Sequence, residues 1–156
     1  MKALVVYDSF FGNTELVARA VAESLGAAAV RVAEAKPEAL AGVELLVVGS
    51  PTRAFRPSPE TLAFLTRIPV GSLAGVRVAG FDTRIAEADM PAVLRLIVRV
   101  FGYAAKPIVA RLRRLGGTVA AEPAGFIVKG KEGPLAEGEL ERAQVWARQI
   151  AETTTS

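Results

Sequence analysis

Residues 3–26 read ALVVYDSFFGNTELVARAVAESLG, which gives an apolar segment, a short polar loop and an amphipathic segment in that order. Lys2–Tyr7 is an apolar run rich in valine, typical of a parallel strand covered on both faces. From Asn13 the apolar residues recur at helical spacing, with Leu16 on the inward face, and Gly26 stands where a helix would end. A strand followed by a helix in this way predicts an α/β fold.

The same alternation of strand and helix continues along the chain. Five strands alternating with helices predict a doubly wound parallel sheet, with residues 1–153 as a single domain and residues 154–156 as a loose C-terminal end. We expect Leu62 to face inward from a helix at Glu60–Ile68. The further expected strands are Ala28–Val32, Leu45–Gly49, Val76–Phe81 and a fifth made of Thr118–Ala121 and Phe126–Val128, interrupted at residues 122–125; the further expected helices are Glu60–Ile68, Ala104–Leu115 and Glu137–Thr153.

The composition excludes several kinds of chemistry. The 156 residues are 51% hydrophobic and 22% charged, as in globular proteins, and they include no cysteine and no histidine. Disulfides, thiol chemistry, thiolate or imidazole metal sites and a histidine base are therefore excluded. Redox or acid–base work would need a bound cofactor or the other polar side chains, and we name no catalytic or metal-ligating residue.

Charge and hydropathy limit the partners. A net charge of +3 and a pI near 9.6 suit an anionic ligand or an acidic partner, and we expect no nucleic acid partner. The first apolar run is too short for a signal peptide, and Pro91–Ala110 is interrupted by Arg95, Arg99 and Lys106. We therefore expect no integral membrane segment and a cytoplasmic location.

The loop of residues 8–14 has the properties of an anion site. Ligands of such sheets bind beyond the carboxyl ends of the strands, where this loop begins. Ser9, Asn13 and Thr14 can donate hydrogen bonds, the helix N-terminus adds partial positive charge, and Gly12 allows the backbone to approach closely. The loop is neither a P-loop nor a G-x-G-x-x-G turn. The alternative is an ordinary turn in which Asn13 caps the helix.

The motif Ser9-Phe10-Phe11-Gly12-Asn13-Thr14 resembles the FMN phosphate loop of the flavodoxin family, which reads roughly Ser/Thr-x-x-Gly-Asn-Thr after the first strand. The resemblance implies a flavodoxin-like, three-layer α/β/α fold with five parallel strands in the order 2-1-3-4-5, and FMN as the cofactor. The family's second flavin loop is similar to Val48–Thr52, and the third loop and C-terminal part of a small flavodoxin-domain subgroup are similar to Phe81–Arg84, Phe126–Val128, Gly133-Pro134-Leu135 and Gly138-Glu139.

The resemblance also implies which residues hold FMN. Phe55 is the candidate for stacking on the flavin ring, whereas Tyr103 and Trp146 lie in helical patterns and are expected to be packing residues. Arg53, Arg56 and Arg84 would place positive charge around the ring, so we expect a less negative reduction potential than in acidic flavodoxins. The expected contacts are Ser9, Phe10, Phe11, Gly12, Asn13 and Thr14 for the phosphate, and Pro51, Thr52, Arg53, Phe55, Asp82, Thr83 and Arg84 for the rest of FMN.

Three functions fit this interpretation. The first is electron transfer through bound FMN to a redox partner protein. The second is an FMN-dependent NAD(P)H:quinone-type reductase, and the third is a flavin-free interaction module on the same fold. The apolar segment 86–102 is a lid over the ring, a homodimer surface, a membrane-surface helix or a segment packed on its own domain.

Overall fold

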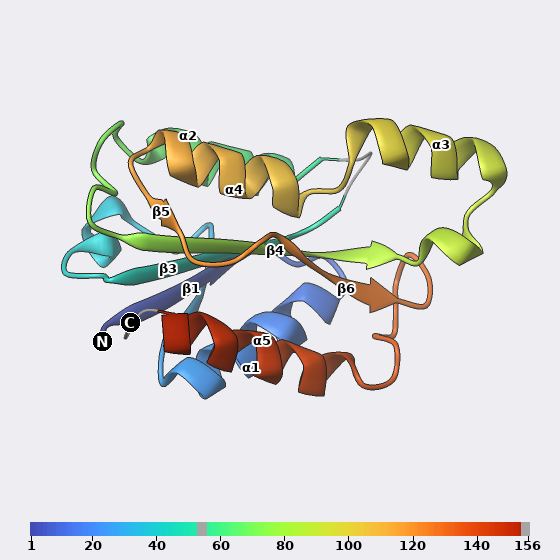
Figure 1. Cartoon of the computed structure of the whole chain (residues 1–156), viewed down its shortest axis with the longest axis horizontal. Coiled ribbons are helices and arrows are strands. Elements are labelled where there is room, and N and C mark those ends of the chain that lie inside the picture. Colours follow the sequence, from blue (N-terminus) through green and yellow to red (C-terminus); the bar gives the residue numbers. More distant parts are fainter. Residues whose placement is uncertain (53–55, 154–156) are drawn as a thin grey trace.

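The computed structural model describes residues 1–52 and 56–153, which form three layers (Figure 1). A parallel sheet lies between two layers of helices. The helices α1 (Asn13–Leu25) and α5 (Glu139–Thr153) cover one face, and α2 (Pro59–Arg67), α3 (Ala92–Phe101) and α4 (Ala105–Arg114) lie on the other. The strands are β1 (Ala3–Tyr7), β2 (Ala28–Arg31), β3 (Leu45–Pro51), β4 (Arg77–Ile85), β5 (Thr118–Val119) and β6 (Ala124–Val128), and the short 3₁₀ helices are η1 (Pro37–Leu40) and η2 (Glu87–Asp89).

The strand order confirms the predicted sheet. The strands run in the order β2-β1-β3-β4-β5, and β6 also pairs with β4. The strand β4 pairs in parallel with both β5 and β6: Arg77 faces Thr118 of β5, and Phe81 faces Ala124 of β6. The two segments β5 and β6 therefore share one side of β4, as predicted for a fifth strand interrupted near residue 122.

The strand β4 is longer than the sequence pattern predicts, because it runs to Ile85 rather than to Phe81. Asp82, Thr83 and Arg84, which we expected in a loop, belong to the strand. They pair with β6, and Asp82 and Thr83 also pair with β3, so hydrogen bonds from both neighbours hold polar residues in the extended conformation. Because side chains alternate along a strand, Thr83 points to one face of the sheet and Asp82 to the other.

Two apolar clusters hold the helices on the sheet. The cluster on the α2–α4 face includes Phe64 and Ile108, and the cluster on the α1–α5 face includes Phe81 and Phe126. Trp146 of α5 packs edge-on against both of these rings, with centroids 6.0 and 6.1 Å away. The prediction that Trp146 is a packing residue is confirmed.

Leu16 and Leu62 do not face inward as expected, since they are 50% and 40% exposed. The buried arc of α1 includes Ala18 and Ala22, because this helix packs against α5 as well as against the sheet, and the arc is therefore turned away from Leu16. The buried arc of α2 is centred on Thr61, which leaves Leu62 at its flank.

The apolar segment 86–102 forms η2 and then α3, which extends past the carboxyl end of β4 (Figure 1). Among the described residues, no helix combines the length and the hydropathy that crossing a bilayer requires.

Candidate functional site

The loop between β1 and α1 is shaped by hydrogen bonds within it. Asp8 Oδ1 accepts the backbone N–H of Ser9 at 2.9 Å, and Ser9 Oγ accepts the N–H of Gly12 at 3.1 Å. Gly12 has a φ of 90°, a conformation that residues with a side chain rarely adopt. The Ser9 hydroxyl keeps its own proton, since it acts as an acceptor in this bond, and it can donate to a ligand.

The N-terminus of α1 is open at this loop. Gly12 is the capping residue, and no side chain caps the helix. The Asn13 side chain instead donates from Nδ2 to the carbonyl oxygen of Glu132 at 3.1 Å, so the alternative interpretation of Asn13 as a cap is wrong. The first N–H groups of a helix have no partner inside the helix, and they remain available here to an anion.

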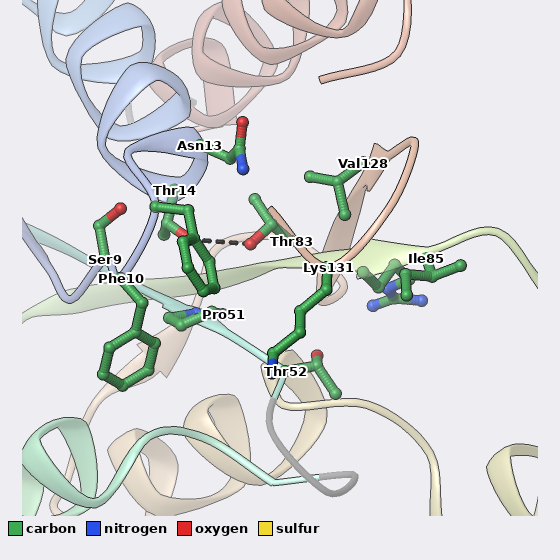
Figure 2. A pocket seen from close by; sticks show the side chains of 12 residues that line it. Ser9, Phe10, Asn13, Thr14, Pro51, Thr52, Thr83, Ile85, Val128 and Lys131 are labelled. Atoms are coloured by element: carbon green, nitrogen blue, oxygen red, sulfur yellow. Dashed lines mark hydrogen bonds between the residues drawn. The ribbon is translucent and has the colours of Figure 1, made fainter. Parts of the chain in front are cut away.

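A cavity of about 110 Å³ lies beside this helix N-terminus, where the carboxyl ends of β1, β3, β4 and β6 meet (Figure 2). It brings together nine of the residues that the sequence assigned to the site. Gly12 shapes the loop without lining the cavity, and Arg53 and Phe55 lie outside the described residues. The lining residues are Ser9, Phe10, Phe11, Asn13, Thr14, Pro51, Thr52, Thr83, Arg84, Ile85, Val128 and Lys131.

Two threonines join the loop to the sheet inside the cavity. The hydroxyls of Thr14 and Thr83 are 2.7 Å apart, and both residues are buried (Figure 2). One hydroxyl donates to the other, which leaves one O–H free to donate to a ligand. The start of α1 and the end of β4 therefore present a joint hydroxyl donor.

Asp82 and Arg84 form an ion pair on the other face of β4, with the carboxylate buried and the guanidinium partly exposed. Arg84 Nε and Nη2 donate to the two carboxylate oxygens of Asp82 at 2.6 and 2.7 Å, and the N–H of Ala105 donates to Oδ2 at 2.8 Å. Burial raises the pKa of the Asp82 carboxyl, and the bonds from Arg84 and Ala105 offset part of that rise. Arg84 passes over Gly125 of β6, where a Cβ atom would collide with the guanidinium.

This pairing changes what Arg84 can contribute to a ligand. The Asp82 carboxylate compensates its charge, so Arg84 would stabilise a neighbouring anion less than a lone arginine would. The Asp82 side chain itself does not line the cavity. Arg84 also lies over the ring of Tyr103, with Cζ 3.7 Å from the ring centroid.

A second, more apolar cavity of about 180 Å³ adjoins the first beneath α3. The two cavities share Thr52, Arg84 and Ile85. Tyr103 lies between α3 and α4 rather than within a helix, and it lines this cavity. The other lining residues are Met90, Leu94 and Val98.

Sequence reasoning missed Lys131, which brings a positive charge to the first cavity from the segment after β6. Figure 2 shows its side chain extending across the cavity toward Thr52. Lys131 was missed because no local motif marks it. Its place after a strand could have indicated it, because the carboxyl ends of parallel strands share one edge of the sheet. Ile85 and Val128 were missed for the same reason.

Comparison with solved structures shows where this architecture occurs. A flavodoxin from the domain Archaea aligns over 100% of this chain and 100% of its own length, with a TM-score of 0.74 and 22% sequence identity. The chain adopts the flavodoxin fold. Oxidised Flavodoxin 2 from Bacillus cereus is also 22% identical over 97% of this chain and 99% of its own, with a TM-score of 0.72. A WrbA-like flavodoxin from Agrobacterium tumefaciens is 20% identical over 99% of this chain and 98% of its own, with a TM-score of 0.69.

No protein-family model and no curated protein sequence matches the chain. In the flavodoxin fold the strand order reverses between β1 and β3, and open α/β sheets bind ligands in the crevice outside such a switch point. The first cavity lies there, with Ser9 following β1 and Pro51 at the end of β3.

Proposed function

We propose that this protein binds FMN non-covalently and acts in electron transfer, with residues 1–153 as one flavin-binding domain. The observation that carries the proposal is the open N-terminus of α1, which faces a cavity at the switch point of a flavodoxin fold beside the hydroxyls of Ser9 and Thr14. These groups are donors without a charge of their own, which suits a phosphate group bound by directed hydrogen bonds.

The residues of both cavities fit the two ends of FMN. The N–H groups of Asn13 and Thr14 and the hydroxyl of Ser9 would hold the phosphate, and Lys131 adds one positive charge. The apolar cavity beside them, with Ile85, Met90 and Leu94, suits the flavin ring system. Bound FMN would supply the redox chemistry, while the protein positions the cofactor and sets its electrostatic surroundings.

The test is FMN binding by purified protein and by variants. We expect yellow protein that releases FMN on denaturation, and apoprotein that quenches FMN fluorescence on titration. The double variant Ser9→Ala/Thr14→Ala should bind FMN at least about 100-fold more weakly, because two hydrogen bonds to a charged group are lost. Thr66→Ala removes an exposed hydroxyl that bonds only its own helix, and it should bind as the wild type does.

The outcomes separate this proposal from the flavin-free module. Wild-type apoprotein without affinity for FMN at micromolar concentration would overturn the proposal and leave an interaction module on this fold. Unchanged affinity in Ser9→Ala/Thr14→Ala would show that the phosphate is held elsewhere.

An FMN-dependent NAD(P)H:quinone-type reductase is the second candidate. The apolar cavity next to the cationic Lys131 favours it, because a reductase must admit a second, partly aromatic or anionic reactant beside its flavin. Anaerobic mixing of the FMN-loaded protein with NADPH distinguishes the two roles. Rapid bleaching of the flavin absorbance without a separate reductase supports the reductase, and unchanged absorbance supports a carrier that depends on a partner protein.

A further inference from the structure

The outward side of α3 is an apolar stripe. Val93, Leu96 and Val100 recur at helical spacing and are 70%, 65% and 70% exposed. The opposite side of the helix carries Leu94 and Val98, which line the apolar cavity. The helix α3 is therefore apolar on the side toward its own domain and again on the side toward solvent.

Positive charge predominates around this stripe, although carboxylates flank it in the chain at Glu87 and Asp89 before α3 and at Glu122 after α4. Residues 90–121 contain no aspartate and no glutamate. None of the cations in this stretch forms an ion pair with a carboxylate in the part of the chain that the structure describes. Both α3 and α4, which carry all of these cations, lie on the same face of the sheet (Figure 1). The cations are Arg95, Arg99, Lys106, Arg111, Arg113 and Arg114.

A second copy of the chain does not complement this surface. In a two-fold dimer the same patch faces itself, so α3 and α4, which carry six cations and no carboxylate, would bring mostly like charges together. A protein partner is also a poor fit, because the stripe offers only valine and leucine, which are under-represented among the residues that dominate protein interfaces. An exposed aliphatic stripe beside arginines is instead typical of helices that lie in a membrane interface.

We propose that α3 docks on an anionic lipid surface, with Val93, Leu96 and Val100 entering the interface and Arg95 and Arg99 at its lipid phosphates. The cations of α4, on the same face of the protein, add electrostatic attraction to such a surface. Because the inner side of α3 lines the apolar cavity, docking brings that cavity to the bilayer. The proposal depends only on this surface and is independent of FMN.

The experiment is flotation of the full chain with phosphatidylcholine vesicles, with and without phosphatidylglycerol. We expect binding to the vesicles that contain phosphatidylglycerol, little binding to the neutral ones, and release when the salt concentration rises to about 0.5 M. Binding to neither kind of vesicle, or to both equally, would overturn the proposal.

Matched variants show whether α3 is the contact. Leu96→Gln should lower the partition constant roughly tenfold, since the leucine no longer enters the interface, and Arg99→Gln about fivefold. Val145→Gln and Arg148→Gln make the same kinds of change at exposed positions of α5, on the opposite face, and should bind as the wild type does.

Circular dichroism first shows that the variants keep the wild-type fold. Two further results would then contradict docking of α3 on a lipid surface. A dimer in light scattering that Leu96→Gln dissociates would assign the stripe to a second copy. Equal loss of vesicle binding in Arg99→Gln and Arg148→Gln would show that net charge, and not α3, carries the attraction.

Discussion

Gly12 connects the end of β1 to the open N-terminus of α1. Its φ of 90° turns the chain so that the first helical N–H groups face the cavity, and the N–H of Gly12 itself is bonded to Ser9 Oγ. A Cβ atom at this position would meet no other atom within 4 Å. The requirement for glycine is therefore conformational and not steric.

Gly12→Ala should weaken FMN binding more than it affects the rest of the fold. Alanine in this left-handed region costs about 1–2 kcal/mol, and the loop would relax away from the geometry that aims its donors. Gly71→Ala is the matched control: it has a φ of 85°, equally open surroundings and a place in the loop before β4, away from the cavity. Calorimetric titration with FMN should show at least about tenfold weaker binding for Gly12→Ala alone. Equal affinities for the two variants would contradict the role given to Gly12.

The carboxyl end of β4 brings both parts of the site together. One side of this strand offers Thr83 to Thr14, and the other holds Asp82 with Arg84 against the start of α4. The ion pair is buried on the carboxylate side, and Arg84 covers Tyr103 at the edge of the apolar cavity. The end of β4 therefore positions the second cavity as well as the first.

Arg84→Met should destabilise the apoprotein by about 3–5 kcal/mol at pH 7, because it leaves the buried carboxylate of Asp82 without its cation. With Arg84 gone, burial raises the folded-state pKa of Asp82 further above its value in the unfolded chain. The folded state then binds the proton more tightly, so the loss of stability is small below the unfolded-state pKa of about 4 and grows as pH rises through the folded-state pKa. Urea unfolding between pH 4 and 8 measures this dependence.

The double variant Asp82→Asn/Arg84→Met is the control for charge. It removes the titrating group together with its partner, so its unfolding free energy relative to wild type should vary much less with pH. A loss of stability in Arg84→Met that does not change with pH would show that packing over Gly125 and Tyr103, and not the charge, is what Arg84 contributes.

At the scale of the whole molecule, the layers leave the ligand site at one edge of the sheet. The apolar clusters lie on both faces of the strands, while the cavities lie at their carboxyl ends. Ligand binding there adds contacts between α1, β3, β4 and the segment after β6, which the folded chain already brings together. Binding should therefore stabilise the folded state without requiring a rearrangement of the core.

FMN at about 100 times its Kd should stabilise the fold by about 2.7 kcal/mol, which raises Tm by roughly 5–10 °C for a chain of this size. Riboflavin carries the same ring system without the phosphate, and at the same concentration it should raise Tm much less. Differential scanning calorimetry with both ligands measures the two shifts. Equal shifts would contradict a phosphate site at the N-terminus of α1.

The sequence by itself determined the order of the strands and of the helices α1, α2, α4 and α5, and its resemblance to flavodoxins led to the sheet order that the structure confirms. Hydrophobic periodicity is a local property, so buried strands such as Leu45–Gly49 and amphipathic helices such as Asn13–Leu25 can be recognised from neighbouring residues alone. The motif Gly12-Asn13-Thr14 likewise carries its signal within a few residues, because it combines a turn with a helix start.

Only the tertiary structure decided which distant side chains meet. The polar end of β4 became a strand because β6 pairs with it, and the same pairing brought Arg84 over Gly125. Lys131 and Tyr103 reach the cavities from segments whose placement depends on strand register and helix packing. Such contacts join residues far apart in the chain, and no local pattern encodes them.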